Sequence, residues 1–385
     1  MFYIFIAVNE KLKLKSLTLC LKSEVELSQS FLFMIMFRPQ PVPPAKPDFC
    51  IRYISPQYQA QVSGKCRQGN YIKVLTPQNL YSDQQGYKKA VIYLHGFALG
   101  ASEIYESHLQ HLVKQGFYVF YPVYQSGFCQ VQWKFWSNIA EIYQAILNPC
   151  PINAEGWMTN AIASVKDAYT CNGLLDKQVH SYLFGHSLGG LQALSWDYYT
   201  DKVLDSTPAQ LKPQQVLAVD PIPSSDSNIP QPIRFFVNRF GLLKNTVRIQ
   251  NTGCQLNVPV AILHGDSDSI VKLKDWKQMF HYINSQQKRL YTSCTDKHGS
   301  PYMSADHMQA TVYTYFLPNW MAKSIFGGVG TEDNLNWRYI WSALDQVIRG
   351  EKRADDLCFC MGTWSDGKKV KSIVSVLPEN SVEDN

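Results

Sequence analysis

Three short stretches of the sequence hold residue types that together can carry out nucleophilic chemistry. Ser187 lies in "GHSLGG", Asp268 in "HGDSDSIV" and His307 in "SADHMQA". A serine hydroxyl is a weak nucleophile at neutral pH, so it needs a histidine to take its proton and a carboxylate to orient that histidine. The chain order Ser, Asp, His is one of the orders in which such groups act together. The sequence therefore predicts a catalytic triad.

The glycines around Ser187 predict that the serine sits on a sharp turn between a strand and a helix. Gly185 and Gly189 remove side chains that would clash in such a turn, and the following helix would point its N–H groups at a developing negative charge. A second donor is expected from "YLHGFALG", where the amide of Phe97 follows a buried strand.

Two of the three assignments have competitors. Asp220, at the end of "PQQVLAVD", also follows a strand and could orient the histidine in place of Asp268. His298 in "DKHGSP" competes with His307. We favour His307 because "DHMQATVYTYFL" predicts a helix that begins just after it.

Strands and helices are predicted to alternate along most of the chain. A hairpin is expected between Arg52 and Pro77, and buried strands at Ala90–Leu94, 117–124, Tyr182–Phe184, 213–220 and 258–268. Helices are expected at 160–170, 191–202 and 274–286. This alternation favours a mostly parallel central sheet covered by helices on both faces, whose ligands lie beyond the carboxyl ends of the strands.

The composition indicates a globular protein that acts on a small molecule. Of 385 residues, 45% are hydrophobic and 17% charged, and the formal net charge of +5 comes from scattered Lys and Arg, which argues against a nucleic-acid partner. The 10 cysteines show no repeated CxxC pairs, and Cys358 and Cys360 have no neighbouring histidine. We expect ordinary thiols, not a metal site or a disulfide framework, and a cytoplasmic location.

The N-terminal residues are expected to form a weakly structured extension. The apolar runs Phe2–Val8 and Phe31–Phe37 are too short to cross a bilayer, and "RPQPVPPAKP" follows as a linker. The predicted organisation is residues 1–46 as the extension, 47–350 as the catalytic domain and 351–385 as a C-terminal tail of unassigned role. Peripheral membrane association through the extension is the alternative role for it.

The motifs "HGF", "GHSLGG", "GDSDSIV" and "ADHM" resemble those of the α/β-hydrolase fold superfamily, over roughly Pro47 to Leu317. The sequence looks closest to dienelactone-hydrolase-like and lipase-like serine esterases. The resemblance implies Ser187 as nucleophile, Asp268 as acid, His307 as base, and an oxyanion hole formed by the amides of Leu188 and Phe97. In chlorophyllase-like members the acid lies one strand earlier, at the place of Asp220.

A chain of this kind is expected to cleave a carboxylic ester with an apolar portion through an acyl-enzyme, with no metal or organic cofactor. Peptidase, thioesterase and acyltransferase activities use the same triad, and a binding protein on the same fold is a further alternative. Residues 124–151 and 232–243 are expected to form small cap insertions. Phe128, Trp133, Phe135 and Trp136 are candidates to line an acyl pocket.

Overall fold

The computed structural model describes residues 39–125, 129, 153–175, 177–226, 245–312 and 318–376. The chain divides into two compact units, Met1–Val42 and Pro43–Asn385, and every element below belongs to the second. The predicted extension before residue 39, most of both cap insertions and the four aromatic residues proposed for an acyl pocket lie outside the described residues.

The core of the second unit is one nine-stranded sheet in the order β1-β2-β4-β3-β5-β6-β7-β8-β9. The strands are β1 (Tyr58–Ser63), β2 (Tyr71–Pro77), β3 (Lys88–Leu94), β4 (Tyr118–Val123), β5 (Val179–His186), β6 (Pro213–Val219), β7 (Val260–Gly265), β8 (Lys288–Ser293) and β9 (Val374–Val376). Strands β3 to β8 are parallel to one another, whereas β1, β2 and β9 pair antiparallel. The predicted hairpin and mostly parallel sheet are confirmed.

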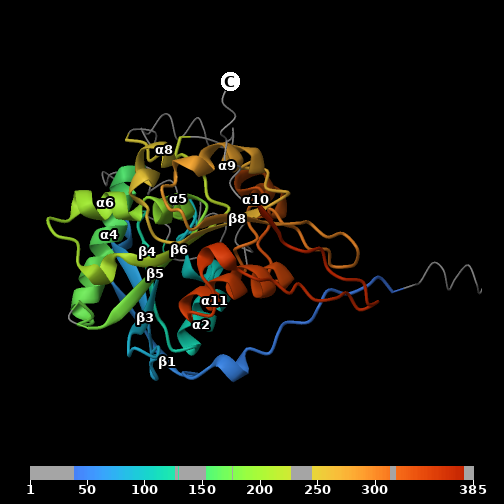
Figure 1. Cartoon of the computed structure of the whole chain (residues 1–385), viewed down its shortest axis with the longest axis horizontal. Helices are drawn as coiled ribbons and strands as arrows, with labels where there is room; N and C mark the ends of the chain where they lie inside the picture. Colours follow the sequence, from blue (N-terminus) through green and yellow to red (C-terminus); the bar gives the residue numbers. More distant parts are fainter. Residues whose placement is uncertain are drawn as a thin grey trace, which may run out of the picture. The chain divides into compact units, whose positions relative to one another are not determined.

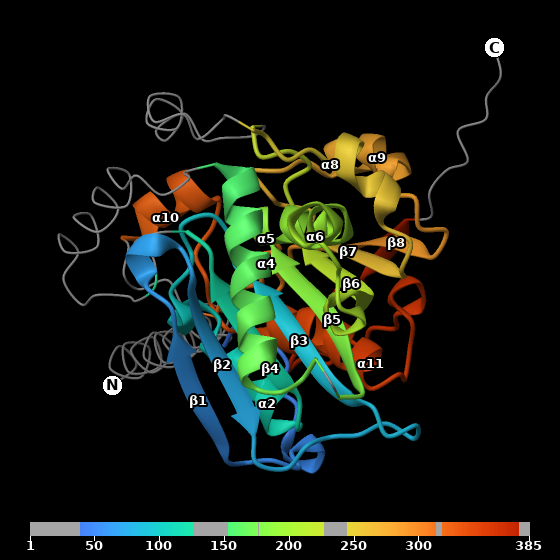
Figure 2. The same ribbon diagram turned by 90° about the vertical axis from the view of Figure 1, so that its left-hand side faces the viewer.

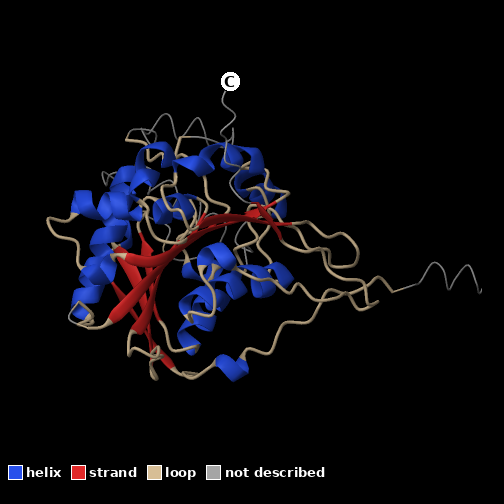
Figure 3. Cartoon of the chain, in the orientation of Figure 1, coloured by secondary structure: helices blue, strands red, loops and turns tan. Residues whose placement is uncertain are grey.

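Helices cover both faces of this sheet (Figures 1 and 3). On one face lie α4 (Ala154–Cys171), α5 (Leu188–Leu194), α6 (Trp196–Val203), α8 (Ile249–Thr252) and α9 (Leu273–Met279), as Figure 2 shows. On the other face lie α2 (Glu106–Lys114) and α11 (Ser342–Ile348). The inner strands are buried almost completely because each face packs against helices. A further helix, α10 (Asn319–Phe326), leads towards the site region.

The structure corrects one helix prediction. Residues 307–312 form successive turns, not a helix, with hydrogen bonds from Gln309 N to Asp306 O and from Thr311 N to Met308 O. The carboxylate of Asp306 accepts the N–H of Met308, a local contact that competes with helix formation. The helix expected just after His307, which was the reason for preferring this histidine, is therefore not formed by residues 307–312.

The C-terminal region packs against β7 and β8 of the sheet. A π-helical segment, Asn336–Trp341, precedes α11, and the hydroxyl of its Tyr339 donates to the carbonyl of Tyr291 and accepts the N–H of His264. Strand β9 pairs with β8, and the Trp364 indole donates to Asp296. Residues 351–376, for which the sequence suggested no role, thus complete one edge of the sheet.

The expectation that all cysteines are thiols is wrong. A disulfide joins Cys66 to Cys129, between the turn that follows β1 and the segment that follows β4. The two residues are 63 positions apart in the sequence, so no local spacing could indicate the pair. Among the described helices, none combines the length and the apolar character that a membrane span requires.

Candidate active site

Ser187 lies on a strained turn between β5 and α5. Its φ of 55° is left-handed, a conformation that a residue with a side chain adopts at a cost of about 1–3 kcal/mol. A Cβ on Gly185 would lie 2.1 Å from the carbonyl oxygen of Gly189, and a Cβ on Gly189 would lie 2.3 Å from that of Leu94. The predicted role of these two glycines is thus borne out by the close backbone approach.

The side chains of Ser187, His307 and Asp268 form a continuous hydrogen-bonded chain. The Nδ1 of His307 is 2.7 Å from Asp268 Oδ2, and its Nε2 is 2.8 Å from Ser187 Oγ. Because a carboxylate can only accept, Nδ1 carries the proton and donates it, so the neutral ring accepts the serine O–H at Nε2. The three residues are 39 and 120 positions apart along the chain.

Main-chain groups hold both the serine turn and the loop that carries Asp268. The N–H of Ser187 donates to Val219 O, and Ile222 N donates to Ser187 O. The second carboxylate oxygen of Asp268 accepts the N–H groups of Ile270 and Val271. Burial opposes ionisation of Asp268, but the adjacent His307 and these hydrogen bonds outweigh it, so the pKa of Asp268 is lowered.

Helices cover both faces of the mostly parallel sheet, and a strained G-x-S-x-G turn joins its central strand β5 to helix α5. The chain has the α/β-hydrolase fold. Ser187 and Asp268 lie beyond the carboxyl ends of β5 and β7, and His307 lies on a turn after β8. Open α/β sheets bind their ligands at this edge.

Comparison with known proteins adds similarity at the level of structure. No family model and no curated protein sequence matches the chain. A structure of a Pyrococcus furiosus esterase is similar at 14% identity and a TM-score of 0.42, covering 66% of this chain and 87% of the esterase. A structure of esterase B from Lactobacillus Rhamnosis is similar at 12% identity and a TM-score of 0.42, covering 71% and 84%. Because these identities and TM-scores are low, the chemistry of the candidate site is inferred from its own geometry.

Asp220, the competing acid, makes a different set of contacts. Its carboxylate accepts the main-chain N–H of Gly265 at 2.8 Å and the side-chain amide of Gln309, and in the described part of the chain it has no hydrogen bond to His307. Burial, and then the charge of Asp268, raise the pKa of Asp220 well above its ordinary value. As pH rises, Asp268 therefore ionises before Asp220.

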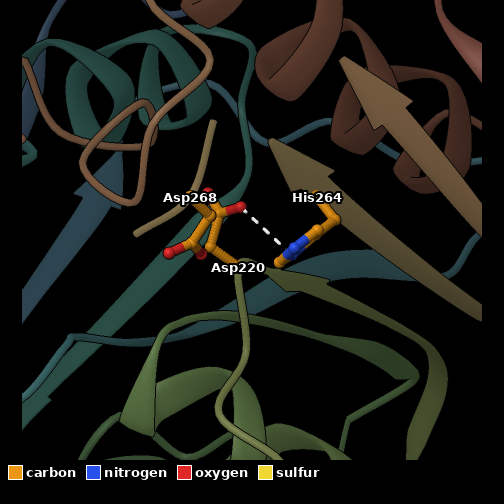
Figure 4. Close-up of side chains that lie close together, drawn as sticks. All are labelled: Asp220, His264 and Asp268. Carbon is orange, nitrogen blue, oxygen red and sulfur yellow. Dashed lines mark ion pairs between the residues drawn. The ribbon is translucent and has the colours of Figure 1, made fainter. Parts of the chain in front are cut away.

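Asp220, His264 and Asp268 form a buried cluster whose nitrogen and oxygen atoms lie within 4.8 Å of one another (Figure 4). The His264 Nδ1 is 3.4 Å from Asp220 Oδ1. Three such groups could approach one divalent cation, but Asp268 is already committed to His307 and two N–H groups, and Asp220 to Gln309 and Gly265. A cation here would have to displace those partners of the two aspartates. The ring nitrogens of His264, in contrast, are buried without a hydrogen-bond partner among the described residues.

Two main-chain N–H groups near Ser187 are candidates to receive a negative charge. The amides of Leu188, at the start of α5, and Phe97, in the loop after β3, have no hydrogen-bond partner in the described part of the chain. The next residue in that loop, Ala98, has a φ of 58°, and its N–H donates to the Gln125 side chain at 2.7 Å. Gln125 thus fixes the loop, a role that the sequence alone did not indicate.

The remaining candidate, His298, lies outside this arrangement. Its Nε2 contacts the carboxylate of Asp366 at 2.7 Å, and its Nδ1 contacts the amine of Lys368. Both partners come from the C-terminal region and are exposed. Of the two histidines weighed, only His307 contacts Ser187 among the described residues.

Proposed function

We propose that the protein is a serine hydrolase that cleaves carboxylic esters with an apolar portion through an acyl-enzyme intermediate. The observation that carries this proposal is the hydrogen-bonded chain from Asp268 through His307 to Ser187, with the serine on a left-handed turn.

In the proposed reaction His307 Nε2 takes the Ser187 proton as Oγ attacks the ester carbonyl carbon. The imidazolium that forms keeps its Nδ1–H on Asp268, whose lowered pKa leaves it ionised to balance that charge. His307 then returns the proton to the leaving alkoxide, which departs as an alcohol. A water deprotonated by His307 attacks the acyl-enzyme and releases the acid, which restores Ser187.

The two unpaired amides support this mechanism because each tetrahedral intermediate carries a negative oxygen. Leu188 N and Phe97 N would donate to it, and loss of one such donor typically costs 10²–10³-fold in kcat. Ile222 and Ile270, which are partly exposed, contact the triad through their main-chain N–H groups, on Ser187 O and on Asp268. With Phe97, also partly exposed, they favour an ester with an apolar part. No metal or organic cofactor is needed for this chemistry, and no nucleic-acid partner is expected.

The experiment that tests the proposal compares one set of acyl groups presented as ester, amide and thioester, with the free acid measured as product. The proposal expects the highest kcat/KM on esters and an increase from acetyl to butyryl or longer chains. Fastest turnover on amides or thioesters, or transfer to an alcohol in preference to water, would move the assignment to peptidase, thioesterase or acyltransferase. The absence of turnover and of fluorophosphonate labelling would indicate a binding protein.

The disulfide bears on where the protein works. Disulfides persist in oxidising compartments and are rare in the cytosol. The bond between Cys66 and Cys129 therefore favours an extracytosolic compartment over the cytoplasmic location that the sequence suggested. Measuring the thiol content of protein isolated from its source under alkylating conditions tests this location.

A further inference from the structure

A second hydrogen-bonded chain joins three parts of the site that are distant in the sequence. The main-chain N–H of Gly96 contacts the Tyr105 hydroxyl at 3.1 Å, and this hydroxyl contacts His186 Nδ1 at 2.8 Å. The Nε2 of His186 contacts the carbonyl oxygen of His307 at 2.8 Å. Gly96 precedes Phe97, and His186 precedes Ser187, so the chain reaches the amide donor, the serine and the histidine base.

The direction of every proton in this second chain is fixed by its two ends. A carbonyl oxygen can only accept, so His186 Nε2 must carry a proton and donate it to His307 O. The neutral ring then accepts at Nδ1, and the Tyr105 hydroxyl supplies its single proton there. The oxygen of that hydroxyl is left to accept the N–H of Gly96. All donors and acceptors match in only this one order.

The ring of His186 is also held in its neutral form. Burial, and then the charge of the neighbouring His307, lower the pKa of His186 to about 3. Protonation at Nδ1 would in addition set an N–H against the Tyr105 O–H. The tautomer of His186 is thus constant over the pH range in which His307 must gain and lose a proton.

We propose that Tyr105 is a positioning residue for catalysis, which acts through His186 on the main chain of His307 and through Gly96 on the loop that presents the Phe97 amide. The inference rests on the proposed serine hydrolase mechanism and assigns to it a residue that touches none of the reacting atoms. A small displacement of the base or the oxyanion donor lowers the rate of the chemical step far more than the binding of substrate. The effect therefore falls on kcat and not on KM.

The test is Tyr105→Phe in the full chain, assayed with p-nitrophenyl butyrate and with a fluorophosphonate probe. The variant leaves the Gly96 N–H and His186 Nδ1 without their partner, and we expect kcat and the labelling rate to fall together by roughly 10²-fold. KM should stay within about threefold of the parent value, because uniform binding is retained. The fall in kcat should be the same from pH 6 to pH 9, since His186 stays neutral.

Tyr93→Phe is the matched control. Tyr93 is as buried as Tyr105, and its hydroxyl contacts a buried histidine in the same manner, His108 Nδ1 at 3.1 Å. Among the described residues neither Tyr93 nor His108 hydrogen-bonds to the triad, and Tyr93→Phe keeps the ring that packs edge-on against Tyr105 at 5.4 Å. Both variants lose one buried hydroxyl, so both should lower the thermal midpoint. Only Tyr105→Phe should lower kcat. Equal kcat in the two variants would overturn the proposal.

A second pair of variants keeps the inference testable if Tyr105→Phe does not fold. His186→Gln keeps an amide N–H that can donate to His307 O and a carbonyl that can accept from Tyr105, whereas His186→Leu keeps neither. We expect His186→Gln to retain at least ten times the kcat of His186→Leu. Equal rates in the two variants would overturn the proposal. Ser187→Ala distinguishes failure of the proposed mechanism from failure of this inference. If Ser187→Ala remains active, the serine hydrolase mechanism is wrong. If Ser187→Ala is inactive but the Tyr105 and His186 variants keep the parent kcat, only the role proposed for Tyr105 is wrong.

Discussion

The carboxylate of Asp220 accepts the main-chain N–H of Gly265, three residues before Asp268, at 2.8 Å. Asp220 thereby supports the end of β7 from the neighbouring strand, while Asp268 contacts the histidine. Two aspartates that follow adjacent strands thus have separate roles: Asp268 belongs to the hydrogen-bonded chain, and Asp220 holds the end of the strand that leads to Asp268.

The two aspartates can be separated by kinetics. Asp268→Asn should keep the fold, because the amide oxygen can still accept the N–H groups of Ile270 and Val271. Its NH₂ group then faces His307 Nδ1 and favours the wrong tautomer of the ring, which costs on the order of 10⁴ in kcat. Asp220→Asn retains an oxygen for Gly265 N and should cost far less. We would measure kcat for both variants with one ester at one pH. If Asp220→Asn is the more damaged variant, the acid has been assigned to the wrong strand.

Ser187→Ala should abolish ester turnover and fluorophosphonate labelling without loss of the fold. The substitution removes only Oγ, and the glycines that permit the turn remain in place. What survives is the slow residual catalysis that arises from binding and the amide donors alone. The measurements are kcat/KM and covalent labelling, with circular dichroism as the check on folding; labelling of the variant at the parent rate would exclude Ser187 as the nucleophile.

The stability of Asp220→Asn should depend on pH in a defined direction. The folded pKa of Asp220 is raised, so the native state binds its proton more tightly than the unfolded chain, and this stabilisation is present at acid pH. It is lost as pH rises from the unfolded value near 4 through the folded value. The thermal midpoint of Asp220→Asn relative to the parent should therefore increase with pH. A difference that stays constant or declines between pH 4 and pH 8 would contradict the raised pKa.

Removal of the disulfide should destabilise the protein. The Cys66–Cys129 bond closes a loop of 63 residues, for which the chain-entropy model gives about 4 kcal/mol at 25 °C. Cys66→Ser should lower the free energy of unfolding by up to this amount, measured by urea denaturation without reductant. Cys171→Ser, at an exposed free cysteine, is the control and should have little effect. Identical unfolding curves for the parent and Cys66→Ser would show that the bond does not form in solution.

The sequence predicted the parts of the site that have local patterns. Glycines at fixed spacing indicated the turn at Ser187, and apolar runs that end in Asp or His indicated strand ends, which a parallel sheet brings to one edge. His307 was found although residues 307–312, the described part of the helix expected after it, form turns. The apolar runs identified the edge of the sheet where His307 lies. The backbone conformation after His307 depends on local side-chain contacts such as that of Asp306 with the N–H of Met308.

Other parts had no local pattern to reveal them. Tyr105 contacts His186 from 81 residues away, and a single tyrosine at a helix start carries no signal of such a partner. Cys66 and Cys129 are separated by 63 residues. Asp220 and Asp268 both follow strands, and what separates them is which distant groups each contacts, Gly265 and Gln309 or His307. These contacts depend on how strands and loops meet in three dimensions, which composition and periodicity do not specify.

The hydroxyl of Tyr339, which bridges His264 on β7 and Tyr291 on β8, has a consequence for biosynthesis. A ribosome that has translated the chain through His307 has already made all three residues of the proposed triad. It has not yet made the tyrosine that ties β7, the strand leading to Asp268, to its neighbour, nor the β9 segment that pairs along β8. Domains fold as their segments emerge, so this edge of the sheet is completed only after the three residues of the proposed triad have been synthesised. A nascent chain therefore holds its reactive groups before it has the framework that aligns them.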